Sequence, residues 1–592
     1  MRDFDGSNAG LPRRRLLQAG GATLALPLLW RRTLAQEAGA GLYDLKTFGN
    51  ARLLHMTDTH AQLRPVLFRE PSVNIGIATM QGRPPHLVGD AFLKRFGIAP
   101  GSREAYAFTY LDFEDGAKRY GRLGGFAHLK SLVTRLRSEA PGGQAVLVDG
   151  GDLWQGSGLA NARKGADMVE AANLLGIEAM TGHWEFTYGQ EGLRANLDRF
   201  KGEFLAQNVF LTEEAAFNES PAFDSASGRV FKPATIKAFG DRRVAIIGQA
   251  FPYVPIAHPK RFTPDWTFGI RDAELQALVD DLRAKEKVDA VVLLSHNGMD
   301  VDLKLASRVA GIDLILGGHT HDAVPEPVAV TNARGKTLVS NAGSNGKFLA
   351  VVDLDLAPGS LRGIRYRLLP VFADLLKPDA EMEALIASLD APHSAEFGRT
   401  LATAEGLLYR RGNFTGSMDH LLCDALRGQL DAQISLSPGF RWGPSTLAGG
   451  SITAADVLAQ TATTYSEVYV QSMTGEQIRS IMEDVCDNLF NPDPYYQQGG
   501  DMVRVGGLSY RCEPGAASGK RISNLTLTEG GSLDPAKTYK VAGWASVNPQ
   551  EGKPVWEVLE AHLGHTGKAT LSADKPVEVD GVAGNPGYGG AA

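Results

Sequence analysis

Near the middle of the chain stands the segment Asp313-Leu314-Ile315-Leu316-Gly317-Gly318-His319-Thr320-His321-Asp322. An apolar run that stops at two glycines indicates a buried strand that breaks into a tight loop. Residues at positions i and i+2 of an extended segment point the same way, so His319 and His321 can present two imidazoles to one centre. Taken alone, the segment is equally compatible with a hydrogen-bonded turn that carries two incidental histidines.

The pattern of an apolar run followed by an acidic or imidazole side chain recurs along the chain. Runs that indicate buried strands lie at residues 51–57, 145–148, 179–180, 289–294 and 313–316. The candidate ligands that follow them are Asp58, His60, Asp152, His183, His296, His319 and His321. Catalytic groups in α/β sheets gather where strands end in loops. We therefore expect these seven side chains to lie close together.

Segments of helical periodicity alternate with the strands, at residues 123–136, 168–175 and 274–285. Such alternation predicts an α/β fold. At 592 residues the chain is too long for one core, since a domain takes roughly 150 residues. We expect a first domain over residues 41–370, a linking helix within residues 371–398 and a second domain over residues 399–592.

Two segments stand outside this alternation. Residues 65–118 combine Pro and Gly punctuation with mixed polarity. They are predicted to form an insertion, helical near residues 87–96, that shapes a channel or docks a partner. The Gly-rich tail, residues 581–592, is predicted to be mobile.

The N-terminus has the features of an export signal. An arginine cluster at residues 13–15 precedes an apolar run over residues 19–30, and residues 35–40 are mostly small. The run is too short to cross a bilayer, and paired arginines are typical of a twin-arginine signal. Residues 1–40 are therefore predicted to be a signal peptide, and the mature protein is expected to be periplasmic and without a membrane span.

Composition argues against other classes of protein. The chain is 43% hydrophobic and 21% charged, as globular proteins are, and its net charge of -7 provides no basic footprint for nucleic acid. The cysteines are Cys423, Cys486 and Cys512, which have neither metal-ligand spacing nor the pattern of a disulfide framework. Buried structural thiols are expected, and the sequence leaves one disulfide open.

Carboxylates and imidazoles together suit manganese, zinc or iron, and one carboxylate can bridge two ions. A two-metal site takes roughly six to eight protein ligands, and the seven candidates supply that number. Asp-x-His, Gly-Asp and Gly-His are weak motifs when they occur singly. Their occurrence in order, each after an apolar run, predicts a dinuclear metal centre.

The motifs resemble those of the calcineurin-like metallophosphoesterases, and in particular the periplasmic 5′-nucleotidase family, over residues 48–570. They read Asp58-Thr59-His60, Gly151-Asp152, Ser295-His296-Asn297-Gly298 and Gly318-His319-Thr320-His321. The resemblance implies an αββα sandwich followed by a smaller C-terminal α/β substrate-binding domain. It also implies one metal held by Asp58, His60, Asp152 and His321. Asp152 would bridge to a second metal, held also by His296 and His319.

One motif departs from the nucleotidase pattern Gly-Asn-His-Glu-Phe-Asp-Tyr-Gly. The chain has Gly182-His183-Trp184-Glu185-Phe186-Thr187-Tyr188-Gly189, in which His183 takes the place of the Asn ligand. Trp184 and Thr187 replace a His–Asp dyad that assists an alkoxide-like leaving group. The substitution resembles the SoxB thiosulfohydrolase family, whose leaving group is a less basic sulfur anion.

The second domain also differs from a nucleotidase. Arg441, within Ser437-Pro438-Gly439-Phe440-Arg441-Trp442, stands where the nucleotidases have a substrate-binding arginine. It is the candidate for holding a sulfonate, and a solvated surface arginine is the alternative. Met502 occupies the position of a base-stacking aromatic residue. Trp544 lies in the second stacking segment, where it could compensate.

The resemblance implies a hydrolase with two divalent metal ions, for which manganese is expected. Its substrate would be an S-thiosulfonated cysteine on the carrier protein SoxYZ, and its product sulfate. Asp152 would bridge the metals, Arg441 would stabilise developing charge, and Trp184 would either wall the pocket or pack in the core. Three alternatives stay open: a periplasmic 5′-nucleotidase or related phosphoesterase, an inactive relative of one, and a non-catalytic protein that holds the loaded carrier.

Overall fold

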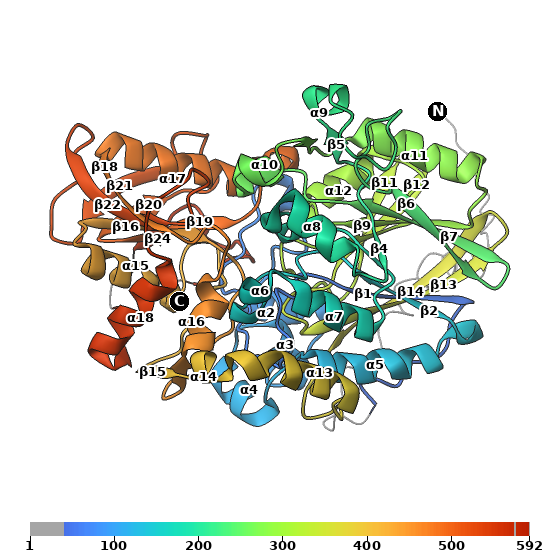
Figure 1. Ribbon diagram of the computed structural model, residues 1–592, viewed down its shortest axis with the longest axis horizontal. Helices are drawn as coiled ribbons and strands as arrows, with labels where there is room; N and C mark the ends of the chain where they lie inside the picture. The colour runs from blue at the N-terminus through green and yellow to red at the C-terminus, as the bar shows by residue number, and fades with distance from the viewer. Residues whose placement is uncertain (1–40, 573–575, 591–592) are drawn as a thin grey trace, which may run out of the picture.

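The computed structural model describes residues 41–572 and 576–590, and the predicted signal peptide lies outside them. Two six-stranded sheets form the centre of the first domain (Figure 1). One has the order β14 (Ser360–Pro370), β13 (Phe348–Ala357), β1 (Ala51–Met56), β2 (Ala145–Asp149), β3 (Ala179–Met180) and β4 (Glu203–Phe204). The other has the order β11 (Val328–Asn332), β12 (Gly335–Asn341), β10 (Leu314–Gly317), β9 (Ala290–Ser295), β7 (Arg242–Gln249) and β6 (Ala234–Phe239). The strands predicted from the apolar runs are confirmed.

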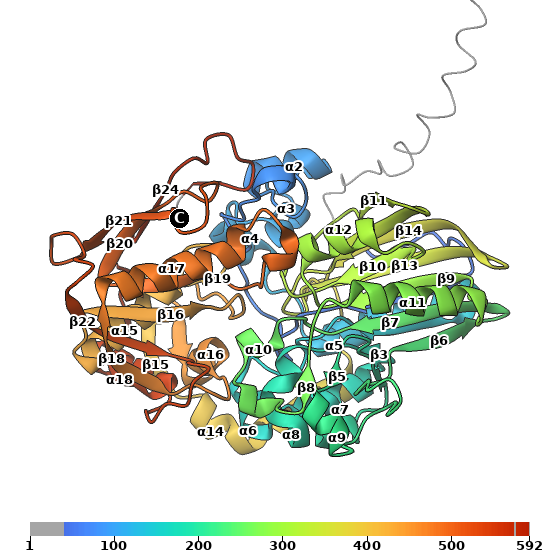
Figure 2. The same ribbon diagram turned by 90° about the horizontal axis from the view of Figure 1, so that it is seen from above.

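Helices cover the outer faces of both sheets (Figures 1 and 2). Over the first sheet lie α5 (Phe126–Ser138) and α7 (Ala166–Leu175), and over the second lie α11 (Asp272–Ala284) and α12 (Met299–Arg308). Apolar side chains from both sheets, such as Val148 and Val292, share one core between the sheets. A sheet covered on both faces needs apolar residues on both sides of each strand, which is why the strand runs are continuous rather than alternating. The fold is the αββα sandwich expected from the sequence.

Strand register brings the candidate motifs to one end of the sandwich. In the first sheet Met56 of β1 pairs with Asp149 of the parallel strand β2. In the second sheet Gly317 of β10 pairs with Ser295 of the parallel strand β9. Parallel strands end at the same edge, so the loops that follow these four residues start side by side.

The insertion is built into the core rather than attached to its surface. It contains α2 (Gly89–Phe96), α3 (Arg103–Phe108) and α4 (Phe113–Tyr120), so the helix predicted near residues 87–96 is confirmed. The ring of Phe108 packs 4.8 Å from that of Phe348 on β13. The buried ammonium of Lys347 pairs with Glu70 at 2.5 Å and also donates to two backbone carbonyls of the segment.

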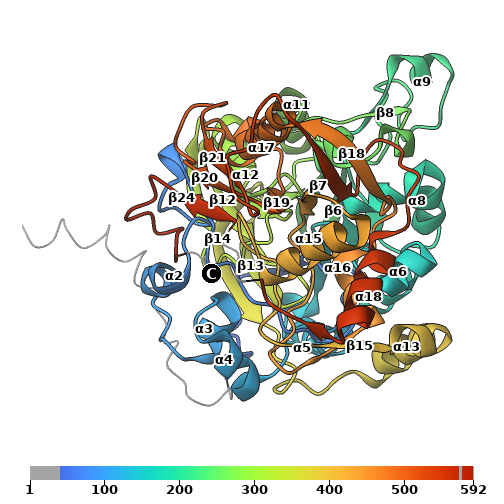
Figure 3. The same cartoon turned by 90° about the vertical axis from the view of Figure 1, so that its left-hand side faces the viewer.

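The second domain faces the viewer in Figure 3. Its largest sheet has the order β18 (Val468–Thr474), β22 (Thr538–Trp544), β16 (Ile434–Gly439) and β19 (Asp501–Gly506). The two smaller sheets have the orders β17 (Ser451–Thr453), β15 (Thr400–Ala404), β23 (Lys568–Ala569) and β21 (Ile522–Leu527), β20 (Leu508–Cys512), β24 (Val577–Val579). Its main helices are α15 (Ser417–Leu430), α16 (Ala454–Thr461), α17 (Gly475–Phe490) and α18 (Val555–Thr566).

The connection between the domains contains α13 (Ala380–Asp390). The sequence predicts an exposed linking helix here. The structure shows a helix with one buried face, formed by Met382, Ile386 and Leu389, which join the core that includes α5 and α7. The linking helix therefore packs against the first domain, and only its other face is exposed.

The prediction of a mobile tail is wrong for residues 581–590. The Asn585 side chain donates to the Gly76 carbonyl at 3.0 Å, and the backbone N–H of Asn74 donates to the Gly587 carbonyl at 2.8 Å. Tyr588 forms a β-bridge with Val73. The tail folds back onto the insertion, because its glycines let two backbone segments approach closely and Asn585 donates a hydrogen bond across the contact. Gly-rich composition alone predicts flexibility and does not reveal this contact.

Over the described residues no helix is both long and apolar enough to cross a membrane.

Candidate metal centre

The seven candidate ligands converge in one buried cluster. Their ligand atoms form two groups, Asp152, His183, His296, His319 and Asp58, His60, Asp152, His321, and within each group these atoms lie within 4.8 Å of one another. Asp152 belongs to both groups. Its Oδ2 atom lies 3.2 Å from His296 Nε2, 3.3 Å from His183 Nδ1 and 3.5 Å from His60 Nε2. The geometry supports a dinuclear centre, and the ligand role of each residue stays a prediction.

Backbone conformation aims these side chains inward. Five of the seven have positive φ: Asp58 (52°), His60 (46°), Asp152 (57°), His319 (73°) and His321 (60°). Left-handed conformations are rare for residues other than glycine, and they cluster where function over-determines the backbone. The apolar strands fix the loop ends, and the residues with positive φ turn side chains from three loops, those after β1, β2 and β10, toward one point.

Neighbouring groups fix the orientation of the imidazoles. The Nδ1–H of His296 donates to the Gly150 carbonyl at 2.6 Å, and that of His60 donates to the Gln155 carbonyl at 3.2 Å. In each ring this tautomer leaves Nε2 free to bind a metal. The buried Glu185 carboxylate accepts from the backbone N–H of Leu153 and of His183, at 2.7 and 2.8 Å. Glu185 thereby ties the Asp152 loop to the His183 loop, a role that the sequence motif did not reveal.

Most of these imidazoles are held neutral. Burial lowers the pKa of His60 to about 4 and lowers the pKa values of His319 and His321 well below the ordinary value. Burial also opposes charge on His296, but Asp152 and Asp58 outweigh it and raise its pKa to about 10. Without metal, the positive charge of protonated His296 therefore offsets negative charge on the neighbouring carboxylates.

The donor set fits divalent metal ions. Both ring nitrogens of His183 and of His319, together with Nε2 of His296, are buried without any hydrogen-bond partner. Buried polar atoms without partners are costly and rare. Neutral imidazole nitrogens beside carboxylate oxygens are the ligands that manganese, zinc and iron accept, so bound metal would satisfy one nitrogen of each ring.

A cavity of about 310 Å³ opens onto the cluster between the domains. Trp184 of the first domain and Phe440 and Trp442 of the second form much of its aromatic wall, and Ile481 and Val485 of α17 also line it. The Trp442 ring stacks on His60 at 4.9 Å, and Trp184 meets Trp442 edge-on at 4.9 Å. Trp184 thus lines the cavity and is only 4% exposed. The sequence predicted no role for Trp442, because its contact with His60 joins residues that lie far apart in the chain and in different domains.

Arg441 lies beside the cluster at the junction of two cavities. It donates to the Gly500 carbonyl at 2.6 Å and pairs with Asp501 at 3.4 Å. A smaller polar cavity of about 60 Å³ lies on its other side, and the insertion contributes His86 and Asn74 to that cavity's wall. Arg441 is therefore not a solvated surface residue, and the insertion shapes this second cavity.

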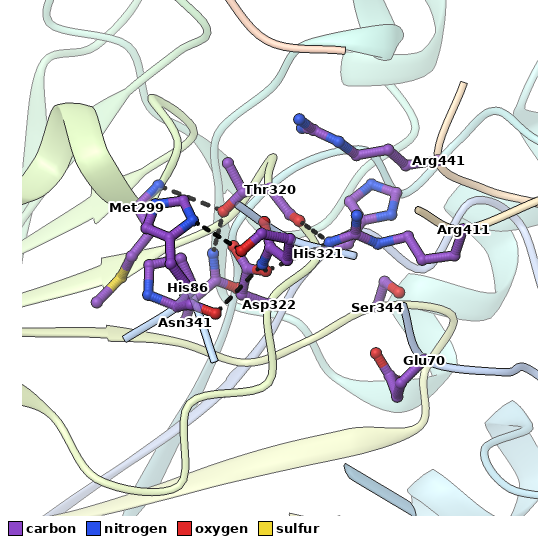
Figure 4. Close-up of polar contacts among 12 residues, drawn as sticks. Glu70, His86, Met299, Thr320, His321, Asp322, Asn341, Ser344, Arg411 and Arg441 are labelled. Atoms are coloured by element: carbon purple, nitrogen blue, oxygen red, sulfur yellow. Dashed lines mark hydrogen bonds and ion pairs between the residues drawn. The ribbon is translucent and has the colours of Figure 1, made fainter. Parts of the chain in front are cut away.

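Arg411 is a site residue that sequence reasoning missed. Figure 4 shows its guanidinium beside Asp322 and near Arg441; it donates to the Thr320 carbonyl at 2.8 Å and to Asp322 at 3.3 Å. The preceding residue, Arg410, is instead paired with the buried Asp419. The sequence shows two adjacent arginines, and only the structure distinguishes the one that faces the cluster.

The positions that stack a nucleobase in the nucleotidases do not face the large cavity. Met502 is fully buried in the core of the second domain. The indole N–H of Trp544 donates to Ser437 at 2.8 Å, and its ring is 3% exposed. Neither residue is among the described residues that line the cavity. Trp544 therefore does not compensate for the missing aromatic residue.

Comparisons with known proteins agree with this architecture. Residues 51–323 match the calcineurin-like phosphoesterase family, and residues 401–560 match the C-terminal domain of the 5′-nucleotidases. The rat 5′-nucleotidase is 28% identical over 325 residues, which cover 51% of this chain and 54% of that protein. The chain thus spans about half the length of this relative. Protein UshA of Escherichia coli is 24% identical over 72% of this chain and 81% of its own.

Two solved structures extend the comparison. A 5′-nucleotidase precursor from Thermus thermophilus has a TM-score of 0.70 at 22% identity, covering 89% of this chain and 99% of its own, and it shows the shared fold. The sulfate thiohydrolase SoxB of Thermus thermophilus, solved in complex with glycerol, has a TM-score of 0.84 at 36% identity. That match covers 91% of this chain and 98% of the other. The chain therefore belongs to the SoxB family, within the 5′-nucleotidase group of the calcineurin-like metallophosphoesterases.

Proposed function

We propose that this metallophosphoesterase-family hydrolase removes the terminal sulfonate from an S-thiosulfonated cysteine on the carrier protein SoxYZ. Written with R for the carrier, the reaction is R–S–S–SO₃⁻ + H₂O → R–S–S⁻ + SO₄²⁻ + 2 H⁺. One observation carries the proposal. Trp184 and Thr187 replace the dyad of the nucleotidases in a site where all seven candidate ligands still converge.

The leaving group explains why the dyad can be absent. An alkoxide is strongly basic, so a phosphoesterase gains from a general acid that protonates it. A persulfide anion is a much weaker base and departs without a proton. In the structure Thr187 hydrogen-bonds to Thr464 at 2.5 Å, and Trp184 packs against Tyr465 and Trp442. Trp184 therefore serves the wall of the cavity, and Thr187 joins the first domain to Thr464 of the second; neither side chain is suited to proton transfer.

Two divalent metal ions, when bound, would activate water and polarise the sulfonate. The residues that would hold them are the seven of the cluster, with Asp152 shared. Arg441 is placed to offer its planar guanidinium to a sulfonate, as arginine does to other oxyanions. Trp184 and Trp442 exclude water beside the reacting group, which strengthens its electrostatic interactions with the site.

The decisive experiment offers thiosulfonated SoxYZ and AMP side by side to the mature protein. Separate samples are loaded with manganese, zinc or iron, because the ligand set accepts all three. We expect sulfate from the carrier, little phosphate from AMP, and the highest rate with manganese. Phosphate without sulfate would overturn the proposal, and tight carrier binding without either product would identify a non-catalytic binding protein.

Arg441→Ala tests the oxyanion role within the same assay. We expect at least a tenfold fall in kcat/KM for the carrier with unchanged metal content, because the guanidinium hydrogen-bonds to Asp501 and to two backbone carbonyls and to no candidate ligand side chain. Arg441→Lys should recover part of the loss, since lysine keeps the charge but not the forked geometry. Full activity in Arg441→Ala would remove Arg441 from the proposed mechanism.

A periplasmic 5′-nucleotidase remains the second candidate, because the rat 5′-nucleotidase is similar to 51% of this chain. We also infer export by the twin-arginine route from residues 1–40. Replacement of the arginine cluster at residues 13–15 by lysine should keep the precursor in the cytoplasm. Unchanged export would indicate another route.

A further inference from the structure

Two of the three cysteines lie in contact inside the second domain. The Sγ atoms of Cys486 on α17 and Cys512 on β20 are 3.5 Å apart, and both residues are 0% exposed. The third, Cys423, lies on α15, where its backbone carbonyl accepts a hydrogen bond from Ser435. All three are free thiols in the structure.

Among the described residues, no candidate metal group includes either cysteine. Both residues belong to an apolar cluster with Met482 and Phe490, and the nearby Glu483 carboxylate is held by backbone N–H groups of Arg521 and Ile522. Two thiols in contact have one characteristic reaction in common, which is oxidation to a disulfide. A disulfide needs the sulfur atoms at about 2.05 Å, so bond formation requires the two sulfur atoms to approach by roughly 1.5 Å from their contact at 3.5 Å.

The chain between the two cysteines forms part of the active-site cleft. Cys486 and Cys512 are separated by 26 positions. This stretch contains the roof loop, defined here as residues 491–500, followed by β19. Gly499 and Gly500 line both cavities, and the Gly500 carbonyl holds Arg441. A cross-link between the cysteines would therefore fix both ends of the segment that roofs the metal cluster.

We propose that Cys486 and Cys512 form an oxidisable dithiol whose disulfide closes the segment that carries the roof loop. The oxidant is a disulfide compound, either a small molecule or a thiol–disulfide oxidoreductase of the exported compartment. The exchange balances as Cys486–SH + Cys512–SH + R–S–S–R → Cys486–S–S–Cys512 + 2 R–SH. One protein thiolate attacks the oxidant, and the second displaces it from the mixed disulfide.

The chemistry of the pair makes this exchange slow in the folded protein. The contact with Cys486, followed by burial, raises the pKa of the Cys512 thiol far above its ordinary value. The thiolate is the reacting species, so oxidation takes place during folding or during long incubation.

Thiol counting tests the proposal on the full wild-type chain. The metal-loaded protein is incubated with oxidised glutathione or with dithiothreitol, then denatured and alkylated with a maleimide. We expect three alkylated thiols per chain after dithiothreitol, one after oxidised glutathione, and a peptide cross-link between Cys486 and Cys512. Three alkylated thiols after both treatments, or a cross-link that includes Cys423, would overturn the proposal.

The third cysteine provides a matched control. Cys423→Ala should still lose both remaining thiols on oxidation, and Cys512→Ser should keep Cys486 alkylatable. Because Cys512→Ser can fail to fold, a second measurement uses the wild type alone. Hydrogen exchange of residues 491–500 should be slower in the oxidised protein than in the reduced one, while exchange in α5 stays the same. Equal exchange in the roof loop would show that the disulfide does not restrain the cleft.

Discussion

At the scale of single residues, Asp152 determines how the two halves of the cluster are coupled. Its Oδ2 atom lies within 3.5 Å of one histidine in one group and of two in the other. Burial opposes its charge, but His183 and His296 outweigh burial and hold its pKa well below the ordinary value. A carboxylate that stays ionised between two sets of imidazoles is suited to bridge two cations.

Substitution of the shared residue should remove more metal than substitution of an unshared one. We expect Asp152→Ala to lose both ions and His183→Ala to lose one, with sulfate release reduced about 100-fold or more in each, because a lost ligand disturbs the whole site. Metal analysis by plasma mass spectrometry measures the stoichiometry. His258→Gln is the matched control. The buried His258 ring has its centroid 5.2 Å from that of His183, but His258 belongs to neither group of candidate ligands. Loss of metal in His258→Gln would place the centre elsewhere.

Metal binding should release a proton from His296. Its pKa in the metal-free protein is about 10, so below that pH the ring is protonated, and a metal must displace the proton. Affinity is therefore expected to rise with pH up to about pH 10, by as much as tenfold per pH unit. Titration calorimetry in two buffers of different ionisation enthalpy gives the number of protons released. His296→Gln should release about one proton fewer, and an equal release would assign the proton to another group.

At the scale of elements, the roof loop is shaped by contact with the metal cluster. A Cβ atom built on Gly499 would lie 2.0 Å from His319 Nε2, whereas one built on Gly500 would meet nothing within 4 Å. Both glycines have positive φ, of 85° and 79°. Their backbone strain on substitution is therefore equal, and only the steric contact differs.

The two glycines form a matched pair for mutagenesis. Gly499→Ala should weaken metal binding and lower kcat/KM by about 10- to 100-fold, because His319 or the roof loop must move. Gly500→Ala should cost only the strain of a left-handed alanine, roughly 1 kcal/mol of stability. Sulfate release and metal content, measured for both variants, distinguish the effect of the steric contact from that of backbone strain. Similar losses in the two variants would show that backbone strain, and not the contact with His319, governs the loop.

At the scale of the whole molecule, the C-terminal tail of the described chain packs against the insertion. Residues 585–589 hydrogen-bond to residues 72–76, and Asn74 in turn donates to Asp322, next to the ligand candidate His321. The insertion also supplies Glu70 to the buried Lys347. The tail, the insertion and the metal loops thus form one connected structure.

Removal of the tail should therefore destabilise the protein. Truncation after residue 580 breaks several buried hydrogen bonds, each worth about 1 kcal/mol. We expect a lower Tm and a weaker wall for the polar cavity, measured by thermal unfolding and by hydrogen exchange at residues 72–76. Deletion of residues 591–592 alone serves as the control. A truncated protein with the same Tm would mean that the tail contacts add no stability.

The sequence by itself indicated an α/β fold and located the seven residues that converge, and the resemblance to the 5′-nucleotidase family implied the αββα sandwich. Continuous apolar runs specify buried strands, and parallel strands must end at one edge, so Asp58, Asp152, His296 and His319 were located by local pattern alone. The replacement of the nucleotidase dyad by Trp184 and Thr187 is likewise visible in eight consecutive letters.

Only the tertiary structure decided the features that join distant segments. Four features depend on side chains that are brought together from distant parts of the sequence. They are the position of Arg411 rather than Arg410 beside the cluster, the stacking of Trp442 on His60, the contact of Cys486 with Cys512, and the packing of the tail. Local periodicity reports which face of an element is buried, but it does not report which partner buries it. For that physical reason the candidate metal ligands could be found from the sequence, whereas the walls and roof of the cleft could not.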